Sequence, residues 1–224
     1  MTVDAILEVA AKRSFASALD WPGWSRGGKS PDDALAALVA YGPRYAKVAE
    51  RAGLDFESPA TVDAIRVTER VRGGGGTEFG IPSTPARAEE EPIAADLDRL
   101  TGLLRASWRT FDRAMAAAEG RMLATGPRGG GRDLVRIVDH VRDAEIAYLS
   151  KLGSRAPADS GRPPAERLSE LRDAFIEALT AIASGEPVPT PSRTQKLWSP
   201  RYAVRRTAWH VLDHAWELED RVRP

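Results

Sequence analysis

From residue 92 onward, apolar residues recur every three or four positions in four separate stretches. This spacing places them along one face of a helix, and it predicts helices over 92–119, 132–152 and 164–184, and from Pro200 nearly to the end of the chain. The apolar faces of the first three are Ile93, Leu97, Leu100, Leu104, Phe111 and Met115; Leu134, Ile137, Val141, Ala144 and Tyr148; and Leu168, Leu171, Phe175, Leu179 and Ile182. Four amphipathic helices of about 20 residues are typical of a four-helix bundle.

The first eighty residues follow a different pattern. Apolar residues alternate with short or polar ones over 15–21 and again over 65–72, which predicts two strands, the second with one buried face and ended by a run of glycines. Between them, Ser30-Pro31-Asp32-Asp33 combines an N-cap serine, a proline at the first helical position and acids in the first turn, so a helix begins there.

The two patterns together predict a mainly α protein. We expect a small α/β region over 1–80, a linker over the proline- and charge-rich 81–92, and a four-helix bundle over 93–224.

Composition narrows the function classes. The 32 basic and 32 acidic residues balance, so we expect neither a nucleic-acid nor a membrane partner. No apolar run approaches the roughly 20 residues that span a bilayer, and the N-terminus lacks the basic start of a signal peptide, so we expect a cytoplasmic protein. The chain has no cysteine, which excludes disulfides, iron–sulfur clusters and a protein thiolate nucleophile. Sulfur chemistry here would need a thiol from the substrate.

The three histidines of the chain carry the clearest functional signal. His210 and His214 lie four residues apart in the last helix, so both imidazoles occupy one helix face. His140, in the second helix, also borders an apolar face. A single histidine beside an apolar face is more often a hydrogen-bonded core residue, and His140 alone would be interpreted in that way. The pair, together with a third histidine beside the core, predicts one divalent metal ion held by all three.

Two familiar metal motifs do not fit these residues. Zinc proteases have a glutamate directly after the first histidine, where this chain has Val211. Di-iron bundles have a glutamate three residues before each histidine, where this chain has Ile137, Thr207 and Val211.

The segments DHVRDAEIAYLSKLG, over 139–153, and RRTAWHVLDHAWELEDR, over 205–221, resemble the last helices of the DinB-like superfamily of four-helix-bundle metalloproteins. The resemblance covers residues 93–224 and implies His140, His210 and His214 as metal ligands. It also implies a divalent ion, zinc or nickel first and iron or manganese second, a small-molecule substrate such as the thiols mycothiol or bacillithiol, and a homodimer. The N-terminal ninety residues depart from the family pattern and can reshape or cover the mouth of the site.

A second resemblance concerns the N-terminal region. The stretch FASALDWPGWSRGGKSPDDAL, over 15–35, is similar to the HicB-like small α/β domain, which implies a regulatory protein that contacts a toxin or nucleic acid. Its motif is made of common turn residues, and the alternative interpretation is a small α/β cap that extends the core of the bundle.

Several side chains near the histidines are candidates for supporting roles. Asp213 and Glu217 each lie three residues after a histidine and can orient an imidazole or accept a proton, and Glu145 can do the same on the second helix. Arg205 and Arg206, one turn before His210, either hold an anionic substrate or are surface charges. Trp209 and Trp216 are expected in core or dimer packing.

These residues favour a metal-dependent enzyme that activates a low-molecular-weight thiol or water for transfer or hydrolysis. The alternative is a non-catalytic metal-binding or regulatory interaction module.

Overall fold

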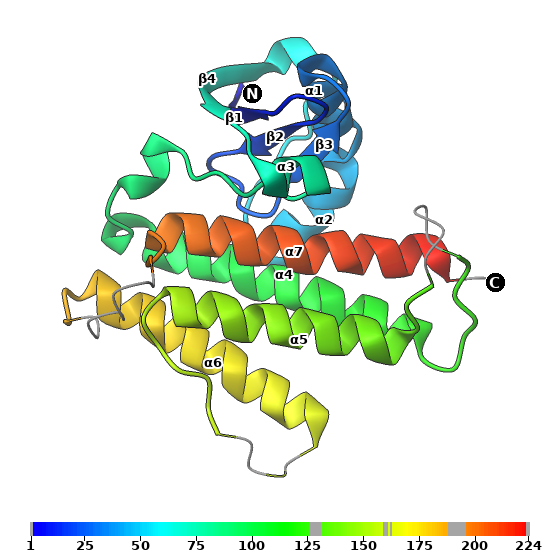
Figure 1. The fold of residues 1–224 in the computed structure, drawn as a ribbon, viewed down its shortest axis with the longest axis vertical. Helices are drawn as coiled ribbons and strands as arrows, with labels where there is room; N and C mark the ends of the chain where they lie inside the picture. The colour runs from blue at the N-terminus through cyan, green and yellow to red at the C-terminus, as the bar shows by residue number, and fades with distance from the viewer. Residues whose placement is uncertain (1, 126–130, 159–160, 162, 188–195, 223–224) are drawn as a thin grey trace.

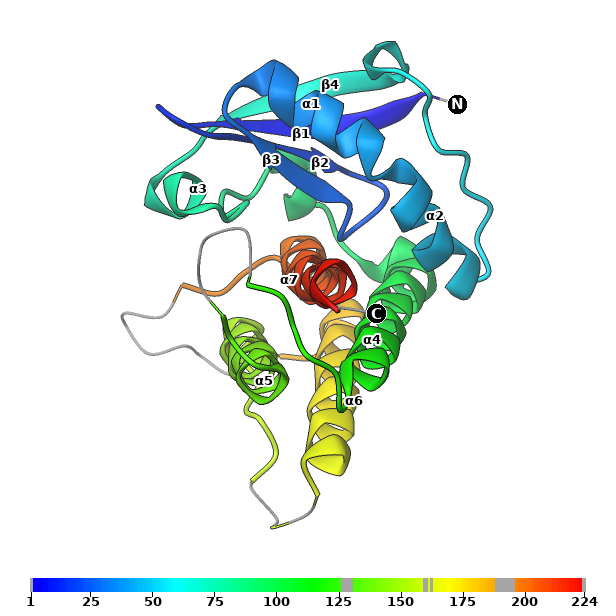
Figure 2. The ribbon, with the colours of Figure 1, turned by 90° about the vertical axis from the view of Figure 1, so that its right-hand side faces the viewer.

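The computed structural model describes residues 2–125, 131–158, 161, 163–187 and 196–222. It is mainly helical, with a small four-stranded sheet near the N-terminus (Figure 1). The sheet and the helices that accompany it lie on one side of the last helix, α7 (Pro200–Arg221), and three further long helices lie on the other side (Figures 1 and 2).

The N-terminal sheet has the strand order β3-β2-β1-β4, with β1 parallel to β4 and the other neighbours antiparallel. The strand predicted over 15–21 ends earlier than expected, and β1 and β3 were not predicted. β1 shows no alternation because nearly all its side chains are buried, and β3, with the sequence SRGG, is short and glycine-rich. The strands are β1 (Val3–Val9), β2 (Ser14–Ala18), β3 (Ser25–Gly28) and β4 (Ile65–Arg72).

Three helices accompany the sheet: α1 (Pro31–Ala40), α2 (Gly42–Arg51) and the short α3 (Gly75–Phe79). The predicted helix start at Ser30 is confirmed. Its hydroxyl accepts a hydrogen bond from the backbone N–H of Asp33, and the Asp33 carboxylate accepts one from the N–H of Ser30. This reciprocal capping box satisfies two backbone donors that the helix itself leaves free.

The four long helices predicted from residue 92 onward are present, as α4 (Leu97–Ala118), α5 (Leu134–Lys151), α6 (Pro164–Ala183) and α7 (Pro200–Arg221). The first begins five residues later than expected, after a 3-10 turn over Ala94–Asp96. α7 contacts α4 and α5, and α6 contacts the same two helices from the other side. Together they enclose the helical core, whose largest fully buried members include Leu104, Phe111, Ile137, Leu149, Leu152 and Phe175.

A second core, the N-terminal core, joins the sheet to the helices. Leu103 of α4 and Leu212 and Trp216 of α7 belong to the same buried cluster as Trp21 and Trp24 of the N-terminal region. The predicted tryptophan packing is therefore within this chain: Trp216 lies in the N-terminal core, and the buried Trp209 makes an edge contact with Phe15 of β2. Neither ring needs a dimer to be covered.

The segment predicted as a linker, 81–92, lies against α7. Tyr202 donates a hydrogen bond from its hydroxyl to the carbonyl of Ser83 at 2.8 Å, and Arg205 forms an ion pair with Glu89 of this segment. Thr84 donates to the Glu8 carboxylate of β1 at 2.8 Å. These bonds connect the sheet to residues 81–92 and connect residues 81–92 to α7. Among the described helices, none is both long enough and apolar enough to cross a lipid bilayer.

We expect Trp216→Ala to lower the free energy of unfolding by about 3–5 kcal/mol, the usual cost of truncating a buried aromatic side chain. Trp216 is only 3% exposed and its ring contacts Tyr41 at 5.2 Å between centroids, so the cavity would lie between α7 and the N-terminal region. Denaturant unfolding measures the loss. Met122→Ala is the control, because Met122 is 75% exposed and should change stability by no more than about 0.5 kcal/mol. Equal effects from the two variants would contradict the shared core.

Candidate metal centre

The histidines are positioned by α7, which is buried on nearly every face. α4 and the N-terminal region cover two of its sides, and α5 covers a third (Figure 2). His210 and His214 project from the side of α7 that meets α5, where they face His140. Because α7 packs into two cores at once, rotation about its axis would expose apolar side chains on both sides.

The three rings converge. The Nε2 atoms of His140 and His210 lie 3.2 Å apart, and one ring nitrogen from each of the three histidines lies within 4.8 Å of the others. Two nitrogens bound to one tetrahedral zinc ion at about 2.0–2.1 Å are about 3.3–3.4 Å apart. One pair thus already has the separation of two metal ligands, and the third ring needs to approach by at most about 1.5 Å. Among the described residues this is the one cluster of this kind.

Burial and charge keep two of these imidazoles neutral. His210 is 7% exposed, and burial lowers its pKa well below the usual value, with the charges of His214 and Arg206 acting in the same direction. Burial also lowers the pKa of His140, followed by the effects of His214 and Arg132. A metal ion binds the neutral imidazole, so the ionisation state that the surroundings favour is also the one that a cation requires.

Glu217 is the carboxylate that belongs to this cluster. Its Oε2 lies 2.8 Å from His214 Nδ1, and its Oε1 accepts a hydrogen bond from Arg221 at 2.6 Å. The hydrogen bond from His214 lowers the pKa of Glu217 despite its partial burial, so the carboxylate stays ionised. With a proton on Nδ1, His214 presents its Nε2 lone pair to the other two rings, as metal-bound histidines do when a carboxylate orients them.

Two other predicted carboxylates lie elsewhere. Asp213 forms an ion pair at 3.2 Å with Arg26 of β3, and its side chain is 40% exposed. Glu145, five residues after His140, is rotated by about 140° around α5 and is buried between other helices, where it accepts a hydrogen bond from Trp108 Nε1 and lies 3.6 Å from Arg172. The suggestion that Glu145 orients an imidazole is therefore wrong.

The two arginines before His210 are not surface charges. Arg205 is 3% exposed and its guanidinium pairs with Glu89 at 2.5 and 2.9 Å, so it joins α7 to the segment before α4. Arg206 is 6% exposed and lies over the rings of Tyr148 and Trp209, at 5.1 and 4.7 Å from their centroids. No described residue forms a hydrogen bond with its buried Nη1.

Sequence reasoning missed two residues of the site. Tyr148 lies two turns after His140 on the same face of α5, and its ring centroid is 5.8 Å from that of His210. Arg221 holds Glu217 and also donates to the carbonyls of Ala124 and Arg132, 2.8 Å from each. The four-residue spacing of Glu217 and Arg221 is a recognisable signal of an ion pair on a helix. Nothing in the sequence indicates the bonds of Arg221 to the backbone carbonyls.

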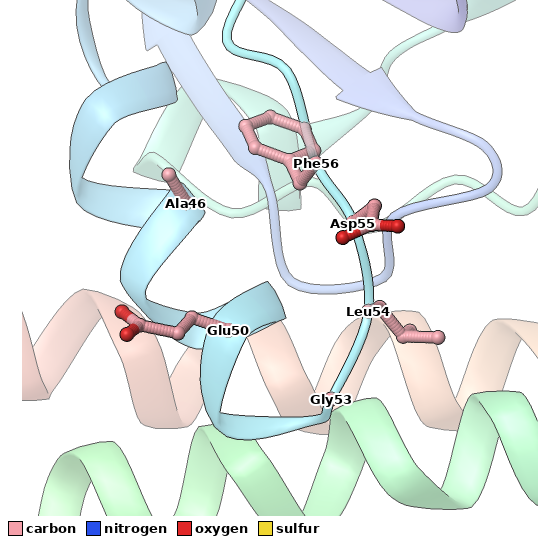
Figure 3. A pocket seen from close by; sticks show the side chains of 6 residues that line it. All are labelled: Ala46, Glu50, Gly53, Leu54, Asp55 and Phe56. Atoms are coloured by element: carbon pink, nitrogen blue, oxygen red, sulfur yellow. The ribbon is translucent and has the colours of Figure 1, made fainter.

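A separate depression lies beside the end of α2, lined by Ala46, Glu50, Gly53, Leu54, Asp55 and Phe56 (Figure 3). The carboxylates of Glu50 and Asp55 point to different sides of it, and it holds no histidine. It lacks converging ligands, so the histidine cluster is the stronger candidate for a site.

In comparisons with protein-family models, curated proteins and solved structures, nothing matches this chain. The geometry above therefore carries the functional argument.

The buried carboxyl of Glu145 gives a pH-dependent prediction. Burial raises its pKa to about 7, against the lowering effects of Arg172 and Trp108. The folded chain therefore holds this proton more tightly than the unfolded chain. The contribution of the protonated carboxyl to the free energy of unfolding is fully present below about pH 4.5 and is lost as the pH rises through 7. The shift corresponds to about 3 kcal/mol.

We expect Glu145→Gln to become more stable relative to the parent chain by about that amount between pH 4 and pH 8. Arg172 keeps an ion pair with Asp112 at 2.8 Å in this variant. Urea unfolding at several pH values measures the difference, and Glu177→Gln, an exposed position on the neighbouring α6, controls for the loss of one charge. A stability difference between Glu145→Gln and the parent that does not change with pH would contradict the raised pKa.

Proposed function

We propose that this protein is a metal-dependent enzyme whose divalent ion is held by His140, His210 and His214. The observation that carries the proposal is the convergence of three ring nitrogens from α5 and α7, with one pair at 3.2 Å. Neutral, largely buried imidazoles and an ionised carboxylate behind His214 support it. We infer zinc or nickel first, with iron or manganese as further candidates, because imidazole ligands suit several of these ions.

The arrangement of α4 to α7 also supports a DinB-like four-helix bundle over residues 93–224. Each of these helices contacts at least two of the others around the helical core, and the three histidines lie inside that arrangement, on α5 and α7. Both observations agree with the resemblance of 139–153 and 205–221 to that superfamily. The N-terminal region packs on the side of α7 that faces away from α6 (Figure 2), and we infer that it stabilises the helix that carries two of the ligands.

The proposed reaction is nucleophilic transfer or hydrolysis by a low-molecular-weight thiol or by water. A divalent ion in a three-imidazole site supplies a Lewis acid that lowers the pKa of a bound water to about 7 or deprotonates a bound thiol. The chain has no cysteine, so a thiol would come from a small molecule. Glu217 would keep the proton of His214 on Nδ1 and so keep Nε2 free as a ligand.

We expect the purified protein to bind one divalent ion per chain and the His210→Ala, His214→Ala double variant to bind none. Metal analysis after dialysis against zinc or nickel measures the stoichiometry. Binding should also raise thermal stability, by about 2.7 kcal/mol when the free metal concentration is 100 times the Kd. Asp213→Asn is the control, because Asp213 is bonded to Arg26 instead of the cluster. Full metal retention by the double variant would refute the site.

Enzymatic function needs a separate readout. Turnover of a thiol and an electrophilic acceptor by the metal-loaded protein should disappear on chelation and return when the ion is restored. Activity that chelators leave unchanged would contradict a metal-dependent mechanism even if the metal binds.

We expect Glu217→Gln to weaken metal affinity by about 10–100-fold, the usual effect of removing a carboxylate that orients a metal-bound histidine. The amide preserves the volume of the side chain but lacks the charge that holds the Nδ1 proton of His214. Competition with a metal chelator of known affinity measures the change. Asp213→Asn, the same chemical change four residues earlier, should leave the affinity unchanged, and equal losses in both variants would point to a general effect of charge.

A further inference from the structure

Arg206 is a buried cation for which the described part of the chain supplies no charged partner. Its side chain is 6% exposed, its Nη1 has no hydrogen-bond partner among the described residues, and no described carboxylate forms an ion pair with it. An unpaired buried charge is costly because the interior does not replace the water that solvates it. The rings of Tyr148 and Trp209, beneath the guanidinium on two sides, offset only part of this cost.

Elsewhere the chain pairs its buried arginines. Arg205, the preceding residue, has both oxygens of Glu89 within 2.9 Å. Arg172, buried between α4 and α6, has Asp112 at 2.8 Å, and Arg221 has Glu217 at 2.6 Å. The missing partner at Arg206 is therefore a local feature of the α5–α7 contact.

The position of Arg206 relates it to the three histidines. It lies one helical turn before His210 on the same side of α7, and both residues contact the ring of Tyr148. The Arg206 charge also acts directly on His210. Four residues along a helix correspond to about 6 Å, so a small molecule can contact the guanidinium and the histidine cluster together.

We propose that Arg206 binds an oxyanion, a carboxylate or a phosphate, on the substrate whose reactive atom meets the metal at the three histidines. This inference rests on the proposed metal site. A guanidinium offers two parallel N–H donors to the two oxygens of such a group, and the substrate would thereby supply the partner that the described residues do not provide. The substrate class is a short compound that carries both the reactive atom and an oxyanion.

The test uses the full chain loaded with Co²⁺, whose absorption reports a bound thiolate directly. Three probes of similar size are titrated: 3-mercaptopropionate, 2-mercaptoethylphosphonate and the neutral 3-mercaptopropionamide. We expect at least one anionic probe to bind about 10–100-fold more tightly than the amide, the range of a charge-assisted hydrogen bond. The tighter of the two anions identifies the oxyanion as a carboxylate or a phosphate.

Four variants test whether Arg206 causes this preference. Arg206→Gln should abolish it, and Arg206→Lys should retain part of it. Arg132→Gln is the matched control. Arg132 is exposed, and its charge also lowers the pKa of His210. The variant therefore removes one positive charge near the site but leaves the buried guanidinium of Arg206 in place. Because Arg206→Met removes an unpaired buried charge and retains much of the apolar volume, it should not lower the Tm.

The failures are distinguishable. If the parent chain binds no Co²⁺, the metal site is wrong and the inference is lost with it. If Co²⁺ and all three thiols bind but the parent chain does not discriminate among them, only the role of Arg206 is wrong. If Arg132→Gln abolishes the discrimination as fully as Arg206→Gln does, the preference comes from overall charge. If Arg206→Met greatly lowers the Tm and leaves the discrimination unchanged, Arg206 has a structural role only.

Discussion

The burial of α7 on several sides at once is the constraint on which the rest of the structure depends. Val211 and Ala215 of this helix belong to the helical core, whereas Leu212 and Trp216 belong to the N-terminal core. Turning the helix in either direction would expose apolar surface to water in both places. The remaining side, toward α5, is therefore held in one orientation, and that side carries His210 and His214. The N-terminal sheet thus acts on the site indirectly, by fixing the helix that presents two of its three imidazoles.

The α5–α7 contact contains two polar side chains with unsatisfied buried atoms. The buried Arg205 is paired with Glu89, and the buried carboxylate of Glu8 accepts hydrogen bonds from Thr77 and Thr84. Nδ1 of His210 and Nη1 of Arg206 are buried and have no hydrogen-bond partner within the described ranges, and Glu217 is already held by His214 and Arg221. Unsatisfied polar groups are rare in folded interiors because each costs free energy. The unsatisfied guanidinium of Arg206 beside the histidine cluster is the observation on which the proposed oxyanion site rests.

Long elements with a regular apolar pattern were predicted well from the sequence, and short elements or those without such a pattern were not. The four long helices were predicted to within five residues at each end, because an amphipathic pattern over many turns is difficult to mistake. β1 was missed because its side chains are buried on both faces, which removes the alternation that identifies a strand. His210 and His214 were selected by their spacing and His140 by its place beside an apolar face, and the structure brings the three together. Their role as metal ligands stays a prediction.

The sequence by itself determined the local relations: the helix that begins at Ser30, the shared face of His210 and His214, and the ion-pair spacing of Glu217 and Arg221. Each depends on residues within a few positions of one another, where helix geometry alone sets direction. Only the tertiary structure decided that Glu217 and not Asp213 joins the cluster, and that Arg205 has an ion-pair partner whereas Arg206 has none among the residues that the structure describes. Adjacent residues on a helix point about 100° apart, so their surroundings depend on elements that are distant in the sequence and that meet them only when the cores pack.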